Sequence, residues 1–441
     1  MNKNLLHRFY TSFPVKIGSG SVVLTFVVLL FLFACKKNKT EEINTYDPNL
    51  PVQLNSFMPD SGGVRTKFII KGSNFGSDKT KVKVYFIDNE KERPATIISL
   101  DNETIYCLVP KQAGGNNSVK VVVGTTIGAS SKLFLYTVAE SVSNIVGVSG
   151  VAGSVNGSLG DGRIQRTFGI AALNNDELIS FETLSSSVRY ISVADNKIAT
   201  LQTGFDGTQP ALNKARNKMY AIGRTVPHKV YAYDKNSLWQ PQIIAAQIPG
   251  STGVIFAAAL DDTEEWLYFR DKNGVFGRLE IAKPTNVQIL NPACGNVGNT
   301  DYCYMIYSKI DDCFFFTVQS FNGVYKVSKD GKTVEEYAGF NGLGKQDAPR
   351  REASFNSPTG MAVDSEGNLY VLDSNTNLVR KINKSSGYVS TIAGTAGVFG
   401  GANGAPMLSS FNYPYSIHLD DSDNIYIGES WGCTIRKLAI E

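Results

Sequence analysis

A small group of aromatic and charged side chains near the C-terminus could bind a sugar. Trp431 stands in a turn-like segment of small and polar residues, where an indole has no apolar strand to join. Rings placed in this way can stack against the C–H face of a pyranose, while nearby charged groups bond its hydroxyls. The alternative is that Trp431 packs over a neighbouring repeat and that Tyr415 fills a central channel. The residues predicted to contact a ligand are Phe399, Tyr413, Tyr415, Trp431, Glu429, Arg350 and Arg351.

The sequence offers little for catalysis. It holds 3 histidines, and only His228 and His418 follow the N-terminal segment, so a histidine-rich zinc site is excluded. No Ser-His-Asp or Cys-His pairing stands out, and no glycine-rich phosphate loop follows a strand. His418 lies in an expected strand that could face a channel, and we interpret Asp261, Asp364 and Asp420 as turn-forming carboxylates. We therefore expect no enzyme, no catalytic residue, no metal and no cofactor.

The charge is nearly balanced, with 43 basic and 40 acidic residues and a formal net charge of +3. A nucleic-acid partner is not expected, because it would need a clustered basic surface. Five cysteines follow position 35, and this odd number does not form a disulfide framework. A pair among Cys294, Cys303 and Cys313 could oxidise outside the cytoplasm, but we interpret these residues as small buried hydrophobes.

Cys35 could carry a lipid. An apolar run over 22–34 follows several positive charges; it is short for a transmembrane helix and typical of a signal peptide. The motif Leu-Phe-Ala-Cys that ends at Cys35 resembles the lipobox of bacterial lipoproteins, which implies cleavage before Cys35 and acylation of that residue. We predict a signal peptide over 1–34, and a lipidated Cys35 with a flexible tether over 35–50. The membrane is then a partner. The expected location is the outer membrane, at the cell surface or, alternatively, facing the periplasm.

Residues 51–138 alternate strand-like runs with turns and show no helical periodicity, which predicts an all-β sandwich. A Pro-x-x-Gly turn at 59–62 leads into a strand, and a Gly-x-x-Phe motif follows at 72–75. These residues resemble the IPT/TIG family of immunoglobulin-like domains. The resemblance implies a spacer or contact module and no catalytic group.

A repeat of 56 residues marks the C-terminal part of the chain. Segment 354–382 aligns without a gap with 410–438, and the Ser-Phe-Asn-x-Pro, Asn-x-Tyr and Arg-Lys motifs recur at this constant offset. Each copy contains four short strands separated by turns, which is the form of a propeller blade. In the first copy the expected strands are 360–364, 369–372, 378–382 and 388–393. With weaker copies upstream, six units begin near 168, 211, 254, 304, 355 and 411.

The blades resemble NHL repeats, through the Pro-Thr-Gly-Met-Ala-Val-Asp sequence at 358–364 and the Asn-Leu-Val-Arg-Lys-Ile sequence at 377–382. The last unit stops after its third strand, and residues 145–153 resemble the fourth strand of the preceding blade. An N-terminal strand should therefore complete the last blade and remove exposed strand edges. We predict an all-β chain in which the sandwich is followed by a six-bladed, NHL-type β-propeller over 143–441, closed by this N-terminal strand.

The long connections 154–167, 339–353 and 395–410 should share one face with the loops that join second and third strands, because strand direction alternates. A lipid anchor, a spacer and a terminal recognition face resemble the surface glycan-binding lipoproteins of polysaccharide-utilisation systems. We expect a non-catalytic protein that binds a polysaccharide for capture and uptake. The second hypothesis is a scaffold for an envelope protein, and the third is a propeller hydrolase or lyase. The ligand, the membrane leaflet, a transporter partner, the oligomeric state and a disulfide among the three clustered cysteines stay open.

Overall fold

The computed structural model describes residues 46–88, 90–112, 114–138, 140–295 and 302–440. The predicted signal peptide and Cys35 lie outside these described residues. Residues 45–441 form one compact unit. The described part is almost entirely β-structure, interrupted by three short 3-10 turns, η1 (Lys235–Ser237), η2 (Gln319–Phe321) and η3 (Pro406–Leu408). Across these ranges, no helix combines the length and the apolar character that a membrane span requires.

Two sheets form the predicted sandwich, and they are antiparallel except for the parallel pairing of β2 with β10. The first has the strand order β1 (Gln53–Met58), β3 (Lys67–Ser73), β7 (Thr104–Leu108) and β6 (Thr96–Leu100). The second has the order β2 (Ser61–Gly62), β10 (Phe134–Tyr136), β8 (Gly115–Val123), β4 (Val82–Asp88) and β5 (Lys91–Pro94), with β9 (Thr126–Ala129) paired to β8. Alternate side chains of β4 and β8 are buried, as the two-residue period of a half-buried strand requires.

Aromatic rings fill the space between these two sheets. Phe68 of β3 lies 5.0 Å from the ring of Phe86 on β4 and 5.2 Å from that of Phe134 on β10. The sandwich also includes residues that the sequence assigned to the tether. The Tyr46 hydroxyl lies 2.9 Å from Thr126 Oγ1, and Asn74 bonds the backbone of residues 47 and 50. The prediction of a flexible tether up to residue 50 is therefore wrong for residues 46–50, because side chains of the sandwich hold them.

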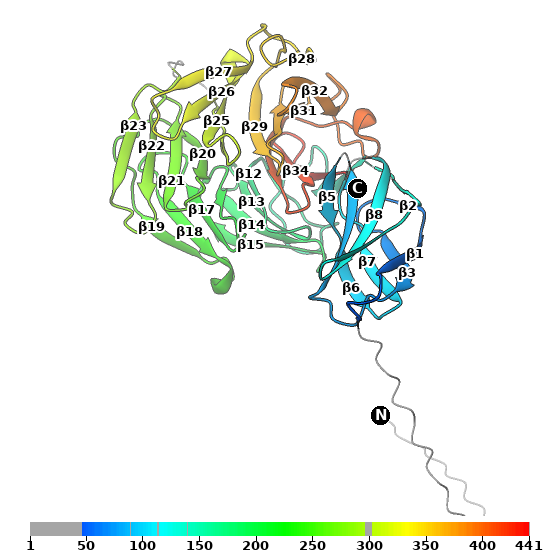
Figure 1. The fold of residues 1–441 in the computed structure, drawn as a ribbon. Helices are drawn as coiled ribbons and strands as arrows, with labels where there is room; N and C mark the ends of the chain where they lie inside the picture. The colour runs from blue at the N-terminus through cyan, green and yellow to red at the C-terminus, as the bar shows by residue number, and fades with distance from the viewer. Residues whose placement is uncertain (1–45, 89, 113, 139, 296–301, 441) are drawn as a thin grey trace, which may run out of the picture. The chain divides into compact units, whose positions relative to one another are not determined.

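Six further sheets follow, and in the first four the strands lie in the order in which they occur in the sequence. The first contains β12 (Thr167–Ala172), β13 (Glu177–Glu182), β14 (Ser187–Ser192) and β15 (Lys197–Thr203). The second contains β16 (Ala211–Leu212), β17 (Lys218–Ile222), β18 (Val230–Asp234) and β19 (Pro241–Ala245). The third contains β20 (Ile255–Leu260), β21 (Trp266–Asp271), β22 (Phe276–Glu280) and β23 (Val287–Asn291). Figure 1 shows the strands of the third sheet side by side, in green.

The remaining sheets contain the NHL-like repeats. The fourth sheet contains β24 (Met305–Ser308), β25 (Cys313–Val318), β26 (Gly323–Ser328) and β27 (Val334–Gly339). The fifth contains β29 (Pro358–Val363), β30 (Leu369–Asp373), β31 (Leu378–Ile382) and β32 (Tyr388–Ala393), and β28 (Ala348–Pro349) pairs with β32. The sixth contains β33 (Pro414–Leu419), β34 (Ile425–Glu429) and β35 (Thr434–Ile440). The six predicted units begin within three residues of the observed first strands, with the largest differences at Pro358 against 355 and Pro414 against 411. The first strand predicted over 360–364 is observed as Pro358–Val363.

The last of these sheets takes its fourth strand from another part of the chain. β11 (Glu140–Gly147) pairs antiparallel with β35 over the register from Glu140 with Ile440 to Gly147 with Thr434. The prediction that an N-terminal strand completes the last unit is thus confirmed, although the strand begins before residue 145. This pairing covers the edge of β35, which would otherwise expose unpaired backbone groups.

The first strands of the six sheets pack against one another in a propeller-like arrangement. β12 lies against β33, β33 against β29, and β24 against both β29 and β20. Glycine permits these close approaches: a Cβ at Gly360 would stand 2.5 Å from the carbonyl oxygen of Tyr415 on the neighbouring first strand. β20 also contacts β16, and Gln209 bonds both backbone groups of Ile170 on β12, at 2.7 and 3.1 Å.

The cysteines pack as small hydrophobic residues. Cys107, Cys294, Cys313 and Cys433 are buried free thiols, and Cys303 is buried too. Burial raises the pKa of the Cys107 and Cys313 thiols to about 12, so these groups stay protonated and unreactive.

Candidate functional site

Three of the predicted aromatic residues meet on the surface. The ring centroid of Tyr413 lies 5.6 Å from that of Phe399 and 5.9 Å from that of Trp431. Phe399 is 55% exposed and Trp431 is 54% exposed. The interplanar angles of 33° and 48° give a curved surface instead of a flat one. We call Phe399, Tyr413, Trp431 and the adjoining Arg166 the aromatic shelf.

The turn between β34 and β35 fixes Trp431 through its neighbours. The Ser430 amide donates to the Tyr413 carbonyl at 2.8 Å, and the Gly432 amide donates to the Asn412 carbonyl at 3.0 Å. The Gly432 carbonyl accepts from the Gly150 amide at 2.9 Å. The backbone on both sides of the indole is therefore satisfied, so the exposed ring is held on a rigid turn.

Sequence reasoning missed Arg166. Its guanidinium carbon lies 4.4 Å from the centroid of the Trp431 ring, which is the distance of a cation–π contact. Arg166 immediately precedes β12, so a residue far from Trp431 in sequence completes the shelf. No repeat motif marks this position, and only the packing of the first sheet against the last one brings the two side chains together.

Glu429 does not belong to the exposed surface, and the prediction that it bonds a ligand is corrected. Its side chain is fully buried, and its Oε1 accepts from the Asn412 amide at 2.8 Å. Its Oε2 accepts from the Thr434 hydroxyl, and Arg436 Nη1 lies 3.9 Å from Oε1. Burial raises the pKa of Glu429 to about 7. This carboxyl group stabilises the turn beneath the shelf.

Arg350 and Arg351 also have partners away from the aromatic shelf. The Arg350 guanidinium lies 4.7 Å from the ring of Tyr337 on β27, and Arg351 forms an ion pair with Glu336 on the same strand. The prediction that these arginines join the aromatic residues is therefore wrong. The segment 348–349 pairs as β28 with the outer strand β32, which carries the following arginines to the outer part of the fifth sheet.

Tyr415 is buried, whereas Phe399 and Trp431 are exposed, although Tyr413 packs against the cluster that contains Tyr415. It is 9% exposed and stacks on Phe168 of β12 at 5.0 Å, with an interplanar angle of 8°. Tyr302 meets the Tyr415 ring edge-on at 5.6 Å. The cluster of Phe168, Tyr302, Tyr304 and Tyr415 joins the first strands of three sheets, so Tyr415 contributes to packing.

Buried arginines hold the long loops that surround the shelf. Arg436 Nη1 donates to the Ser410 carbonyl at 3.1 Å, and its Nη2 donates to the Ala402 carbonyl at 2.8 Å and to Asn403 Oδ1 at 2.7 Å. This side chain is fully buried and faces Glu429. Two equivalent arginines make the same three contacts: Arg189 with Arg163, Val155 and Asn156, and Arg380 with Ser354, Gln346 and Asp347.

The sequence carried a signal for these loop contacts. Arg380 and Arg436 share the 56-residue offset of the repeat, and so do their loop acceptors at 347 and 403. The buried carboxylates at 373 and 429 keep it as well. An arginine that recurs with an acidic residue seven positions earlier indicated a structural pair.

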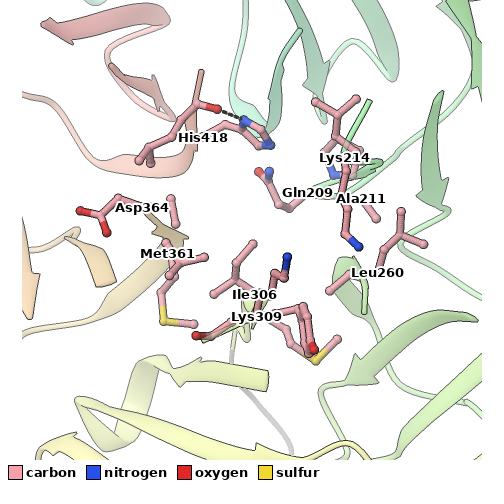
Figure 2. A pocket seen from close by; sticks show the side chains of 18 of the residues that line it. Gln209, Ala211, Lys214, Leu260, Ile306, Lys309, Met361, Asp364 and His418 are labelled. Carbon is pink, nitrogen blue, oxygen red and sulfur yellow. Dashed lines mark hydrogen bonds between the residues drawn. The ribbon is translucent and has the colours of Figure 1, made fainter. Parts of the chain in front are cut away.

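A cavity of about 590 Å³ lies at the other end of the first strands. Figure 2 shows Ile306 and Met361 on its wall, together with Lys214 and Lys309. His418 of β33 also faces this cavity, as the sequence suggested it could. We call this cavity the channel pocket.

The polar groups of the channel pocket are largely engaged. His418 Nδ1 lies 2.8 Å from the Leu419 carbonyl, and burial next to Arg216 lowers the pKa of the imidazole to about 3. A base this weak is poorly matched to proton transfer at neutral pH. Asp364 and Asp420 accept hydrogen bonds from the turns that follow their strands, which confirms their interpretation as turn formers.

Comparison with known families supports both parts of the fold. The IPT/TIG domain family matches residues 52–138, and the NHL repeat family matches residues 355–382. Both resemblances expected from the sequence are confirmed over these ranges. Among curated proteins, none matches the chain.

A solved structure defines the family more closely. A protein of unknown function from Bacteroides thetaiotaomicron is 41% identical, with a TM-score of 0.83, over 90% of this chain and 100% of the other. The chain belongs to the family of that protein.

More distant structures share the fold. An auxiliary nutrient binding protein from Bacteroides thetaiotaomicron is 19% identical with a TM-score of 0.59, over 90% of this chain and 99% of the other. A candidate phosphatase from the same species is 20% identical with a TM-score of 0.57, over 90% of this chain and 98% of the other.

Proposed function

We propose that this protein is a non-catalytic, lipid-anchored binding protein whose aromatic shelf takes a glycan. The observation that carries this proposal is the half-exposed indole of Trp431, held between Tyr413 and Arg166 on a rigid turn. An exposed aromatic side chain normally costs solvation free energy, so a fixed cluster of such rings marks a contact surface. The fold relative described as an auxiliary nutrient binding protein agrees with a binding role.

The proposal includes a closed, six-bladed propeller. The contacts of first strands lead from β12 through Gln209 to β20, then to β24, β29 and β33, which returns to β12. The pairing of β11 with β35 ties the N-terminal part of these six sheets to the last one. A closed ring keeps the loops around the shelf at fixed separations, which a binding surface requires.

The anchor remains a proposal that rests on the lipobox-like motif before Cys35. In this proposal the lipid holds the protein in the outer membrane at the cell surface, and the sandwich acts as a spacer. Cells that produce the full chain should carry it in the membrane fraction, with a diacylglyceryl group on Cys35 in mass spectra. Cys35→Ala should release the protein from that fraction; a variant that stays attached would contradict the anchor.

A glycan array tests the binding function directly. The chain from Thr45 to Glu441 forms one compact unit and should bind at least one polysaccharide. Trp431→Ala should weaken that binding at least about tenfold, because one stacking side chain contributes about 1.5 kcal/mol or more. Tyr388→Ala removes another exposed ring, 44% accessible on the outer strand β32, and should leave binding unchanged. Equal binding by wild type and Trp431→Ala would contradict the proposed site.

A protein partner is the second candidate, and one observation favours it. Apolar side chains in the same long connection as Phe399 are exposed as well: Val398 by 47%, Met407 by 53% and Leu408 by 77%. A protein surface could cover these residues together with Phe399. Photo-cross-linking from position 408 in intact cells distinguishes the two functions, because a scaffold traps one protein reproducibly and a glycan-binding protein does not.

A further inference from the structure

The aromatic shelf carries one arginine whose charge is not used within the protein. In the described part of the chain, the Arg166 side chain makes no hydrogen bond and no ion pair; its contact is the stacking on Trp431. The neighbouring Arg163 donates to the carbonyls of residues 160, 161 and 162 at 3.2, 2.8 and 2.9 Å. The donors of Arg189 and Arg436 bond the loops. The guanidinium N–H groups of Arg166 can therefore donate hydrogen bonds to a ligand.

Two carboxyl groups in the neighbourhood of Arg166, those of Glu182 and Glu429, are paired with other arginines. The charges of Arg166, Glu182 and Glu429 all affect the pKa of the Cys433 thiol, so the three groups lie in the neighbourhood of this residue. Glu182 is fully buried, and its oxygens accept from Ser185 and from Arg189 at 3.0 and 3.4 Å. Glu429 is fully buried beneath the turn. Both acidic groups face inward towards their own arginines, and the exposed charge of the shelf is positive.

We propose, on the basis of the glycan function, that the aromatic shelf selects acidic glycans and that Arg166 binds their anionic group. The rings of Phe399, Tyr413 and Trp431 receive the sugar faces, and the guanidinium fork of Arg166 receives a ring carboxylate or a sulfate ester. A planar guanidinium binds such groups through two parallel hydrogen bonds. Its stacking on the indole restricts the side chain before the ligand arrives, so less conformational entropy is lost on binding.

Matched polymers test this selectivity with the chain from Thr45 to Glu441. Polygalacturonate is compared with its carboxyl-reduced form, and dextran sulfate with dextran, so each pair differs in charge and shares a backbone. At least one acidic polymer should be retained at least about tenfold more strongly than its neutral counterpart in affinity electrophoresis and calorimetry. Which pair shows the difference distinguishes a carboxylate from a sulfate.

Two arginine variants assign the selectivity to one side chain. Arg166→Gln should abolish the preference for the charged polymer and the loss of affinity between 50 and 300 mM salt, while Arg166→Lys should retain part of both. Arg351→Gln removes an exposed arginine that is paired with Glu336 and serves as the control, with unchanged binding. Thermal unfolding of all variants should be alike, since the Arg166 side chain makes no hydrogen bond and no ion pair within the described residues.

The outcomes separate the two proposals. If neutral glycans bind as tightly as acidic ones, or if Arg166→Gln keeps the preference, the inference about Arg166 is overturned while the glycan function stands. If no polysaccharide of either kind binds, both proposals fail. If acidic polymers bind equally to wild type and Trp431→Ala but not to Arg166→Gln, the charge acts without the aromatic shelf, and the proposal is overturned in its stacking part.

Discussion

The aromatic shelf and the channel pocket lie at opposite ends of the same first strands and use their polar groups differently. At the shelf, the carboxylates are buried against arginines, and the exposed side chains have few partners. At the channel pocket, Asp364 and Asp420 shape the turns, and the imidazole of His418 is held neutral. The charged residues that recur from repeat to repeat form hydrogen bonds and ion pairs with the loops of the protein itself. The groups left for a ligand are those outside the repeat pattern.

The largest expected effect comes from removing a loop-holding arginine. Arg436→Ala should lower the free energy of unfolding by about 3–5 kcal/mol, because it leaves the buried Glu429 carboxyl without its ion-pair partner and removes three hydrogen bonds to the loops. Urea denaturation measures the change. The exposed Arg351→Ala should cost at most about 1 kcal/mol. Equal effects of the two substitutions would show that the buried arginine does not stabilise the loops of the shelf.

A pair of aromatic substitutions separates packing from binding. Tyr415→Ala should lower stability by about 3 kcal/mol, because it removes a buried ring stacked on Phe168. Trp431→Ala should change stability by less than about 1 kcal/mol, since its ring is half exposed, yet it should remove binding. Unfolding curves combined with glycan binding measure both properties. A large loss of stability in Trp431→Ala would make the indole a packing residue.

The pH dependence of stability should have opposite signs in the two regions. Burial raises the pKa of Glu429 to about 7, so the folded state binds more protons than the unfolded state between about pH 4.5 and 7, and its contribution falls as pH rises. The pKa of His418 is lowered to about 3, so its contribution falls as pH drops below about 6.5. Each group contributes a slope of at most about 1.4 kcal/mol per pH unit.

Two variants resolve these opposing contributions. Between about pH 5 and 6.5 the two contributions oppose each other. Glu429→Gln should therefore shift the slope of stability against pH in the positive direction, and His418→Gln should shift it in the negative direction. Denaturation midpoints at half-unit steps of pH measure the slopes, with Asp161→Asn as an exposed control. If both variants keep the slope of the wild-type protein, neither group changes its protonation on folding in this range.

The smallest expected effect concerns ligand binding at the channel pocket. His418→Gln should leave glycan affinity within about twofold of wild type, because the described residues that line the channel pocket do not include Phe399, Tyr413, Trp431 or Arg166. Calorimetry with the polymer found on the array measures this. A tenfold loss in this variant would move the ligand site from the shelf to the pocket.

The sequence by itself determined the β-rich class, the IPT/TIG and NHL resemblances and the positions of nearly every first strand. These features depend on local signals: strand alternation, turn residues and an exact 56-residue offset between two repeats. It also indicated that Trp431, Tyr413 and Phe399 would meet, because the loops of one repeat recur on one side.

Only the tertiary structure decided which charged groups join these rings. Glu429, Arg350 and Arg351 were assigned to the binding surface for their type and their proximity in sequence. In the structure Glu429 is buried, and the two arginines contact residues of β27 instead of the shelf. Arg166 joined the shelf because the first sheet packs beside the last one, which no local pattern specifies. The physical reason is that a side chain's exposure and partners depend on contacts between distant segments, whereas strand and turn propensities act over a few neighbouring residues.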